Sequence, residues 1–133
     1  MTIAVVNDPD ANSARFFSRG AIVLVTLNNP REKFWGAILD LTSAGLSVRG
    51  IDLNSFDDFT QMVRSGDSIT PGAMFFPMHR VERMELDLPN GSIPSICDRF
   101  FEKTGQNAAS ALAWPEAAPS KQLPRRTSES ESR

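Results

Sequence analysis

A run of apolar and β-branched residues near the start of the chain constrains the fold more than any other feature. Residues 21–27 read Ala-Ile-Val-Leu-Val-Thr-Leu, with Gly20 before them and Asn-Asn-Pro after them. The run is too short for an independent helix, and β-branched residues favour strands. Because both of its faces are apolar, it must be covered on both sides. The sequence therefore predicts an interior strand at 21–27.

Two further strands are predicted from an alternation with a period of two. Residues 33–41 place four apolar side chains on one face: Trp35, Ala37, Leu39 and Leu41. A turn follows at 42–45, and the alternation resumes at 46–53 but changes phase near Arg49 and Gly50. One extra residue would explain this change, so we expect a β-bulge at Arg49-Gly50 that bends the third strand.

Helix-capping residues and the spacing of apolar residues predict the remaining elements. Phe56, Phe59 and Val63 recur at helical spacing, with Asn54 or Ser55 as the N-cap and Gly66 as the stop. Residues 73–86 predict a strand, one helical turn and a second strand, with adjacent rings pointing to opposite faces at Phe75 and Phe76. A closing helix is expected between Pro94 and Gly105.

These elements fit one small domain in a chain of 133 residues. We expect a flexible N-terminus at 1–10 and a single domain at 11–105, with a helix at each end of the domain. Residues 106–133 are rich in Ala, Pro, Ser, Glu and Arg and show no apolar period. Such a composition does not bury enough surface to offset chain entropy, which predicts a disordered tail.

Composition narrows the expected environment and partners. The formal net charge of −2 gives no overall attraction to nucleic acid. The single cysteine, Cys97, has no partner for an intramolecular disulfide, and no apolar run approaches the length that spans a bilayer. We therefore expect a cytoplasmic protein that does not enter the membrane.

Three segments together resemble the Sm-like small β-barrel. They are residues 21–27, residues 34–53, and the segment 75–84, which reads Phe-Phe-Pro-Met-His-Arg-Val-Glu-Arg-Met. The resemblance implies a mainly β fold with peripheral helices, namely a five-stranded Sm/SH3-like barrel with the helix inserted between strands 3 and 4. It also implies self-association through the edges of the fourth and fifth strands, and RNA binding by an Asp and an Asn around the turn between strands 2 and 3. That turn contains Asp40 here but no Asn.

Two shorter motifs are similar to the paired signature of PilZ domains. Arg15-Phe-Phe-Ser-Arg19 matches an Arg-x-x-x-Arg loop, and the segment 40–45 resembles an Asp-x-Ser-x-x-Gly turn in which Thr42 replaces Ser. The resemblance implies a cyclic di-GMP receptor, in which guanidinium groups stack on guanine and bind phosphate.

No pattern in the sequence indicates catalysis. There is no phosphate-binding loop, nucleophile motif or metal-binding cysteine pair. The single histidine, His79, makes a His-x-x-Glu spacing with Glu82, but in a strand connection that spacing does not converge on a metal. We expect no enzyme activity, no cofactor and no metal.

The sequence thus predicts a non-catalytic binding or scaffolding module that self-associates and binds RNA or another protein. A cyclic di-GMP receptor is the alternative. The candidate ligand-binding residues from both resemblances are Arg15, Arg19, Asp40, Thr42, Gly45, His79 and Arg80.

Overall fold

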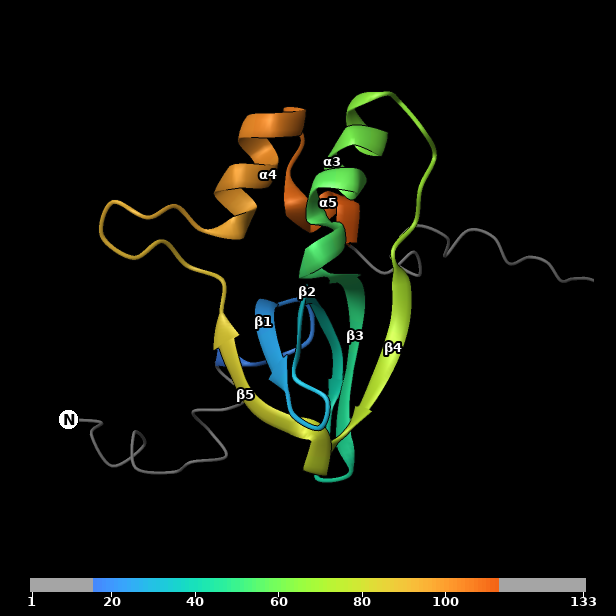
Figure 1. Cartoon of the computed structure of the whole chain (residues 1–133), viewed down its shortest axis with the longest axis vertical. Helices are drawn as coiled ribbons and strands as arrows, with labels where there is room; N and C mark the ends of the chain where they lie inside the picture. Colours follow the sequence, from blue (N-terminus) through green and yellow to red (C-terminus); the bar gives the residue numbers. More distant parts are fainter. Residues whose placement is uncertain (1–15, 113–133) are drawn as a thin grey trace, which may run out of the picture.

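A computed structural model describes residues 16–112, which form a mainly β fold. Five antiparallel strands make one sheet in the order β4-β3-β2-β1-β5. The strands are β1 (Ile22–Leu27), β2 (Glu32–Leu41), β3 (Gly45–Asp52), β4 (Gly72–Pro77) and β5 (Val81–Leu86). The sheet is strongly curled, with α3, α4 and α5 at one end and the connection between β4 and β5 at the other (Figure 1).

The predicted helices that fall within the described residues are present. A 3-10 turn, η1 (Leu53–Ser55), leads into α3 (Phe56–Arg64), which inserts between β3 and β4. The side chain that caps the start of η1 and α3 is Asp52 rather than Asn54 or Ser55, since Ser55 makes no capping hydrogen bond. Between β4 and β5 lies η2 (Met78–Arg80), which confirms the predicted strand, helical turn and strand. Helix α4 (Ile96–Thr104) starts with a capping box formed by Ser95 and Asp98, and it ends at Gly105 in the left-handed conformation.

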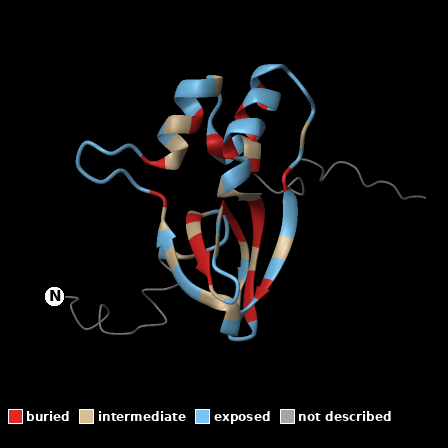
Figure 2. Cartoon of the chain, in the orientation of Figure 1, coloured by how far each residue is buried: buried red, intermediate tan, exposed pale blue. Residues whose placement is uncertain are grey.

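Both faces of the sheet carry a hydrophobic cluster. The inner cluster fills the concave side and contains Val23, Val25, Leu27, Ile38, Leu46, Val48 and Phe76. The helix cluster joins the other face to the helices and contains Trp35, Ala37, Phe56, Phe59, Val63, Phe100, Ala108 and Leu112. Buried residues accordingly lie on the central strands and on the facing sides of the helices (Figure 2). The prediction that the first strand is covered on both sides is confirmed, because β1 contributes to both clusters.

The bulge lies in a different strand from the predicted one. Pairing of β3 with both neighbours runs without interruption through Arg49 and Gly50, whereas β2 shifts register between Ile38 and Asp40. The predicted bulge at Arg49-Gly50 is therefore wrong. The apparent phase change in β3 arises because its two faces are covered by different clusters, so Val48 packs in the inner cluster and Ile51 against the helix cluster.

The sheet is open. Among the described residues, β4 pairs only with β3 and β5 only with β1, so the two outer strands do not join. A five-stranded antiparallel sheet with a few helices is confirmed, and closure into a barrel is not.

The folded part extends beyond the predicted boundary at Gly105. Helix α5 (Ala108–Leu112) packs into the helix cluster, where the side chain of Leu112 is fully buried. Residues 106–112 are therefore not part of a disordered tail. The predictions for residues 1–10, for most of the expected N-terminal helix of the domain and for residues 113–133 lie outside the described residues. Within residues 16–112, none of the helices has the length and apolar character needed to cross a bilayer.

Candidate functional site

Three chain connections meet at the end of the sheet opposite the helices, which we call the turn end. They are the β1–β2 turn at 28–31, the β2–β3 turn at 42–44, and η2. The backbone N–H of Met78 donates to the carbonyl of Ala44 at 2.9 Å, and the N–H of Asn28 donates to the carbonyl of Arg80 at 2.9 Å. Through these two bonds η2 holds both turns in place.

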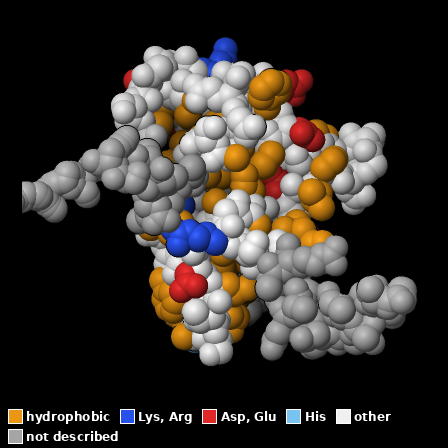
Figure 3. All heavy atoms as spheres, turned by 180° about the vertical axis from the view of Figure 1, so that it is seen from behind, with side chains coloured by type: hydrophobic (Ala, Val, Ile, Leu, Met, Phe, Trp, Pro, Cys, Tyr) orange, Lys and Arg blue, Asp and Glu red, His pale blue; other side chains and the backbone are white. Residues whose placement is uncertain are grey.

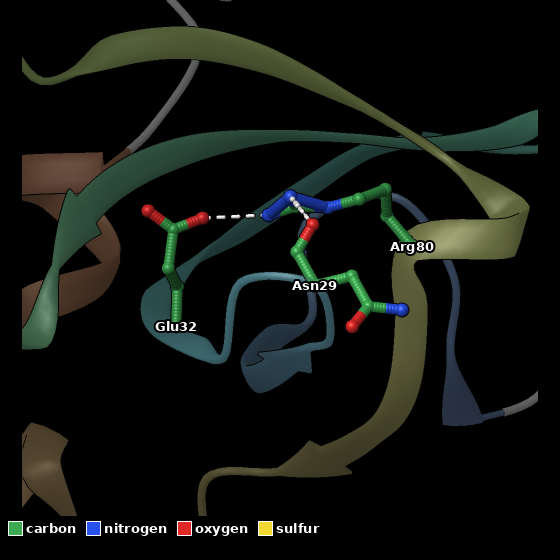
Figure 4. Close-up of polar contacts among 3 residues, drawn as sticks. All are labelled: Asn29, Glu32 and Arg80. Carbon is green, nitrogen blue, oxygen red and sulfur yellow. Dashed lines mark hydrogen bonds and ion pairs between the residues drawn. The ribbon is translucent and has the colours of Figure 1, made fainter.

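Arg80 fastens η2 to the β1–β2 turn. Its Nη2 lies 2.6 Å from Oε1 of Glu32, and its Nη1 donates to the carbonyl oxygen of Asn29 at 3.2 Å (Figure 4). The guanidinium group of Arg80 is therefore already paired with the carboxylate of Glu32. This arrangement gives Arg80 a structural role at the turn end.

Thr42 and Gly45 build the β2–β3 turn. The Thr42 hydroxyl accepts from the N–H of Ala44 at 3.2 Å and donates to the Gly45 carbonyl at 3.5 Å. A Cβ on Gly45 would lie 2.4 Å from the carbonyl oxygen of Phe76 and 2.5 Å from the ring of Phe75. A larger residue at position 45 would collide with the backbone of Phe76 and the ring of Phe75, so only glycine fits there.

The other predicted site residues are distributed over the surface. Arg19 and Asp40 are exposed, and the N–H of Gly20 donates to the Ile38 carbonyl at 2.8 Å, which brings the segment containing Arg19 beside the last part of β2. His79 is exposed on η2. Arg15 lies outside the described residues. Binding of cyclic di-GMP stays a prediction, which calorimetry with that dinucleotide tests directly.

The β4 edge, defined as the outer side of Gly72–Pro77, is the most unusual surface near the turn end. The strand carries no charged residue, and its two rings point to opposite faces as predicted. Phe76 is buried in the inner cluster, whereas Phe75 is 55% exposed. Edge strands of soluble proteins are usually protected by charges, by covering segments or by bulges. The strand at the opposite edge, β5, has charged side chains at Glu82, Arg83 and Glu85.

Sequence reasoning missed a buried carboxylate at the other end of the molecule. Asp87 is only 8% exposed. Its Oδ2 accepts from Nε1 of Trp35 at 3.0 Å and from the N–H of Cys97 at 2.8 Å, and its Oδ1 accepts from the N–H of Ile96 at 2.8 Å. The available signals were a tryptophan whose N–H needs an acceptor when buried, and an acidic residue shortly before a helix.

Burial and the neighbouring Asp87 determine the state of the Cys97 thiol. Burial is the larger cause and a side-chain hydrogen bond to Asp87 the smaller one, and together they raise the pKa of the thiol from 9.0 to about 12. Because the thiolate is the reactive form, Cys97 is protonated and unreactive at neutral pH. Within residues 16–112 no group of three or more His, Cys, Asp or Glu side chains is placed to hold a metal ion.

The chain matches no protein-family model, no curated protein and no solved structure. What it does is therefore inferred from its own geometry.

Proposed function

We propose that the chain is a non-catalytic binding or scaffolding module that self-associates by pairing the β4 edge of one copy with β5 of another. The observation that carries this proposal is the β4 edge, an uncharged outer strand that exposes Phe75. An edge strand offers unpaired backbone donors and acceptors that a second strand can satisfy. Burial of the Phe75 ring would add apolar contact to those hydrogen bonds.

The finer fold belongs to the same proposal. An Sm-like small barrel, with α3 as an insertion between β3 and β4, is supported by the curled five-stranded sheet and by the single helical turn that joins β4 to β5. Sm-like proteins commonly assemble into rings through these two edges, which is the arrangement proposed for this chain.

The charge pattern favours protein over RNA as the ligand. Three cations near the turn end each lie close to a carboxylate: Arg31 to Glu82 at 3.7 Å, Arg80 to Glu32 at 2.6 Å, and Arg83 to Glu85 at 2.7 Å. RNA binding depends strongly on cations that neutralise phosphates. Binding to a second protein surface does not require unpaired cations. Self-association therefore fits this charge pattern better than RNA binding does.

The test is a charge placed on the β4 edge. A lysine on an edge strand opposes strand pairing because its charge would have to be desolvated. We expect Phe75→Lys to shift the sedimentation profile toward monomer and to leave the melting temperature within a few degrees of the wild type, as is usual for exposed positions. The matched control is Phe101→Lys on α4, where the ring is 60% exposed and lies far from this edge.

Two results would refute the proposal. One is a wild-type chain that sediments as a monomer at high micromolar concentration. The other is an equal loss of association in Phe75→Lys and Phe101→Lys, which would show that added charge, rather than the β4 edge, controls assembly.

A further inference from the structure

A groove of about 710 Å³ lies along α4 and α5, on a different part of the molecule from the β4 edge. Its lining includes Pro94, Cys97, Asp98, Phe101, Glu102 and Ala108. This volume is within the usual range for sites that hold small ligands or peptide side chains. We call it the α4 groove.

Helix α4 has two aromatic faces, only one of which serves the core. Phe100 is fully buried in the helix cluster, whereas its neighbour Phe101 is 60% exposed. Asp98, Phe101 and Glu102 are spaced at i, i+3 and i+4, so they lie on one face of the helix. That face combines a large apolar ring with two carboxylates.

The loop before α4 exposes a further apolar side chain, Ile93, which lies in the chain between the lining residues Ser92 and Pro94. The backbones of Asn90 and Ile93 exchange two hydrogen bonds of 2.9 Å, and Gly91 adopts a φ of +62° between them. The turn is therefore hydrogen-bonded, and it holds Ile93 at 65% exposure. Seen from behind, hydrophobic and acidic side chains lie next to one another beside this loop (Figure 3).

The negative charge of the α4 groove indicates which kind of ligand it would bind. Its lining contains Asp98 and Glu102 but no lysine or arginine. Arg99, on the same helix, lies over the ring of Phe56 at 5.1 Å, on the side facing α3. An acidic, partly apolar groove repels nucleic acid and anionic lipid and attracts cations.

We propose that the α4 groove docks a basic, amphipathic helical segment of another protein. Apolar side chains of the segment pack against Phe101 and Pro94, and its Lys or Arg side chains pair with Glu102 and Asp98. Helices that lay an apolar face into a groove are a recurrent mode of peptide recognition. None of the lining residues belongs to β4 or β5, so the groove residues differ from the two edges proposed for self-association.

The test uses the full chain and a fluorescein-labelled peptide of about 14 residues, made of Leu and Lys so that one helical face is apolar. A matched peptide has Glu in place of every Lys. We expect the Leu/Lys peptide to raise fluorescence anisotropy on binding, and the Leu/Glu peptide to bind at least about tenfold more weakly. Glu102→Lys and Phe101→Ser should each weaken binding of the Leu/Lys peptide about tenfold.

Two control variants make the result specific. Asp67→Lys causes the same change in net charge on the exposed loop after α3, and Phe75→Lys alters the β4 edge. Both should bind the Leu/Lys peptide like the wild type. Because self-association is measured by sedimentation of the Phe75 variant, the two proposals can fail independently.

Three outcomes would overturn the docking proposal. The first is a full chain that does not bind the Leu/Lys peptide. The second is equal weakening by Glu102→Lys and Asp67→Lys, which would indicate attraction to net charge alone. The third is loss of self-association in Phe101→Ser, which would make the groove an interface between two copies of this chain.

Discussion

Asp87 joins the two layers of the molecule through a single carboxylate. It accepts one hydrogen bond from Trp35 on β2 and two from the first N–H groups of α4. A negative charge at a helix N-terminus is favoured by the helix dipole, and the Trp35 N–H would otherwise be buried without an acceptor. Asp87 therefore helps to fix the position of α4 over the sheet, together with the buried ring of Phe100.

Replacing Asp87 by Ala should lower the free energy of unfolding by about 3 kcal/mol or more, since each buried donor left without a partner costs about 1 to 3 kcal/mol. Asp87→Asn, which retains one acceptor oxygen, should lose less. Urea unfolding measures both changes. If Trp35→Phe and Asp87→Ala together cost the sum of the single variants, the indole and the carboxylate do not interact as the geometry indicates.

The raised pKa of Cys97 gives a dependence of stability on pH. The folded state holds the thiol proton more tightly than the unfolded state, with a pKa of about 12 against 9.0. This contribution is complete below pH 9 and is lost as pH rises from 9 toward 12. We expect the melting temperature to fall over that interval by a larger amount in the wild type than in Cys97→Ala.

The reactivity of the same thiol provides an independent check. Iodoacetamide should modify Cys97 slowly in the folded chain and much faster in urea, because only the unfolded state has the ordinary thiol pKa. Equal rates in the two states would contradict the raised pKa of this half-buried thiol.

At the scale of elements, α5 shows how a short segment can belong to the core. It spans only Ala108–Leu112, yet Leu112 is fully buried and Ala108 is 3% exposed. Its stability comes from contact with β2 and α4, since an isolated helix of this length does not form in water.

Leu112→Ala should therefore cost about 2 to 5 kcal/mol, as is typical of buried leucine. Ser110→Ala, on the exposed side of the same helix, should change the free energy of unfolding by about 0.5 kcal/mol or less. Chemical denaturation of the two variants checks the prediction. A Leu112→Ala chain as stable as Ser110→Ala would mean that the domain ends before α5, as the sequence alone indicated.

Two glycines that face each other let β2 and β3 approach closely near the middle of the sheet. Gly36 on β2 pairs with Gly50 on β3. A Cβ on Gly50 would lie 2.1 Å from the carbonyl oxygen of Trp35 and 2.6 Å from the Cα of Gly36. Because both obstacles are backbone atoms, only a change in the relative position of β2 and β3 would make room.

We expect Gly50→Ala to destabilise the chain by about 3 kcal/mol or more, at or above the upper end of ordinary overpacking. Gly72→Ala is the control, because no atom lies within 4 Å of a Cβ placed there. Thermal melts of the two variants measure the difference. Similar melting temperatures would show that β2 and β3 do not approach as closely as this at their glycine pair.

Local patterns in the sequence were sufficient to predict the elements. The β-branched run at 21–27 predicted β1, helical spacing from Phe56 predicted α3, and Gly105 predicted the end of α4. At the β4 edge, the opposite orientation of Phe75 and Phe76 was predicted correctly because side chains alternate along a strand. These features depend on residues that are close together in the sequence, so they can be predicted from the sequence alone.

Contacts between distant residues decided the rest. The phase change in β3 reflects two faces that pack on different clusters, while the bulge itself lies in β2. Arg80 pairs with Glu32 because η2 folds back on the β1–β2 turn. Asp87 has its hydrogen-bond partners only because folding brings Trp35 and α4 next to the end of β5. Helix α5 is part of the core although a segment of its length does not form a helix on its own. Hydrogen-bond partners and burial of this kind leave no periodic signal in the sequence, because they are set by segments that meet only in the folded chain.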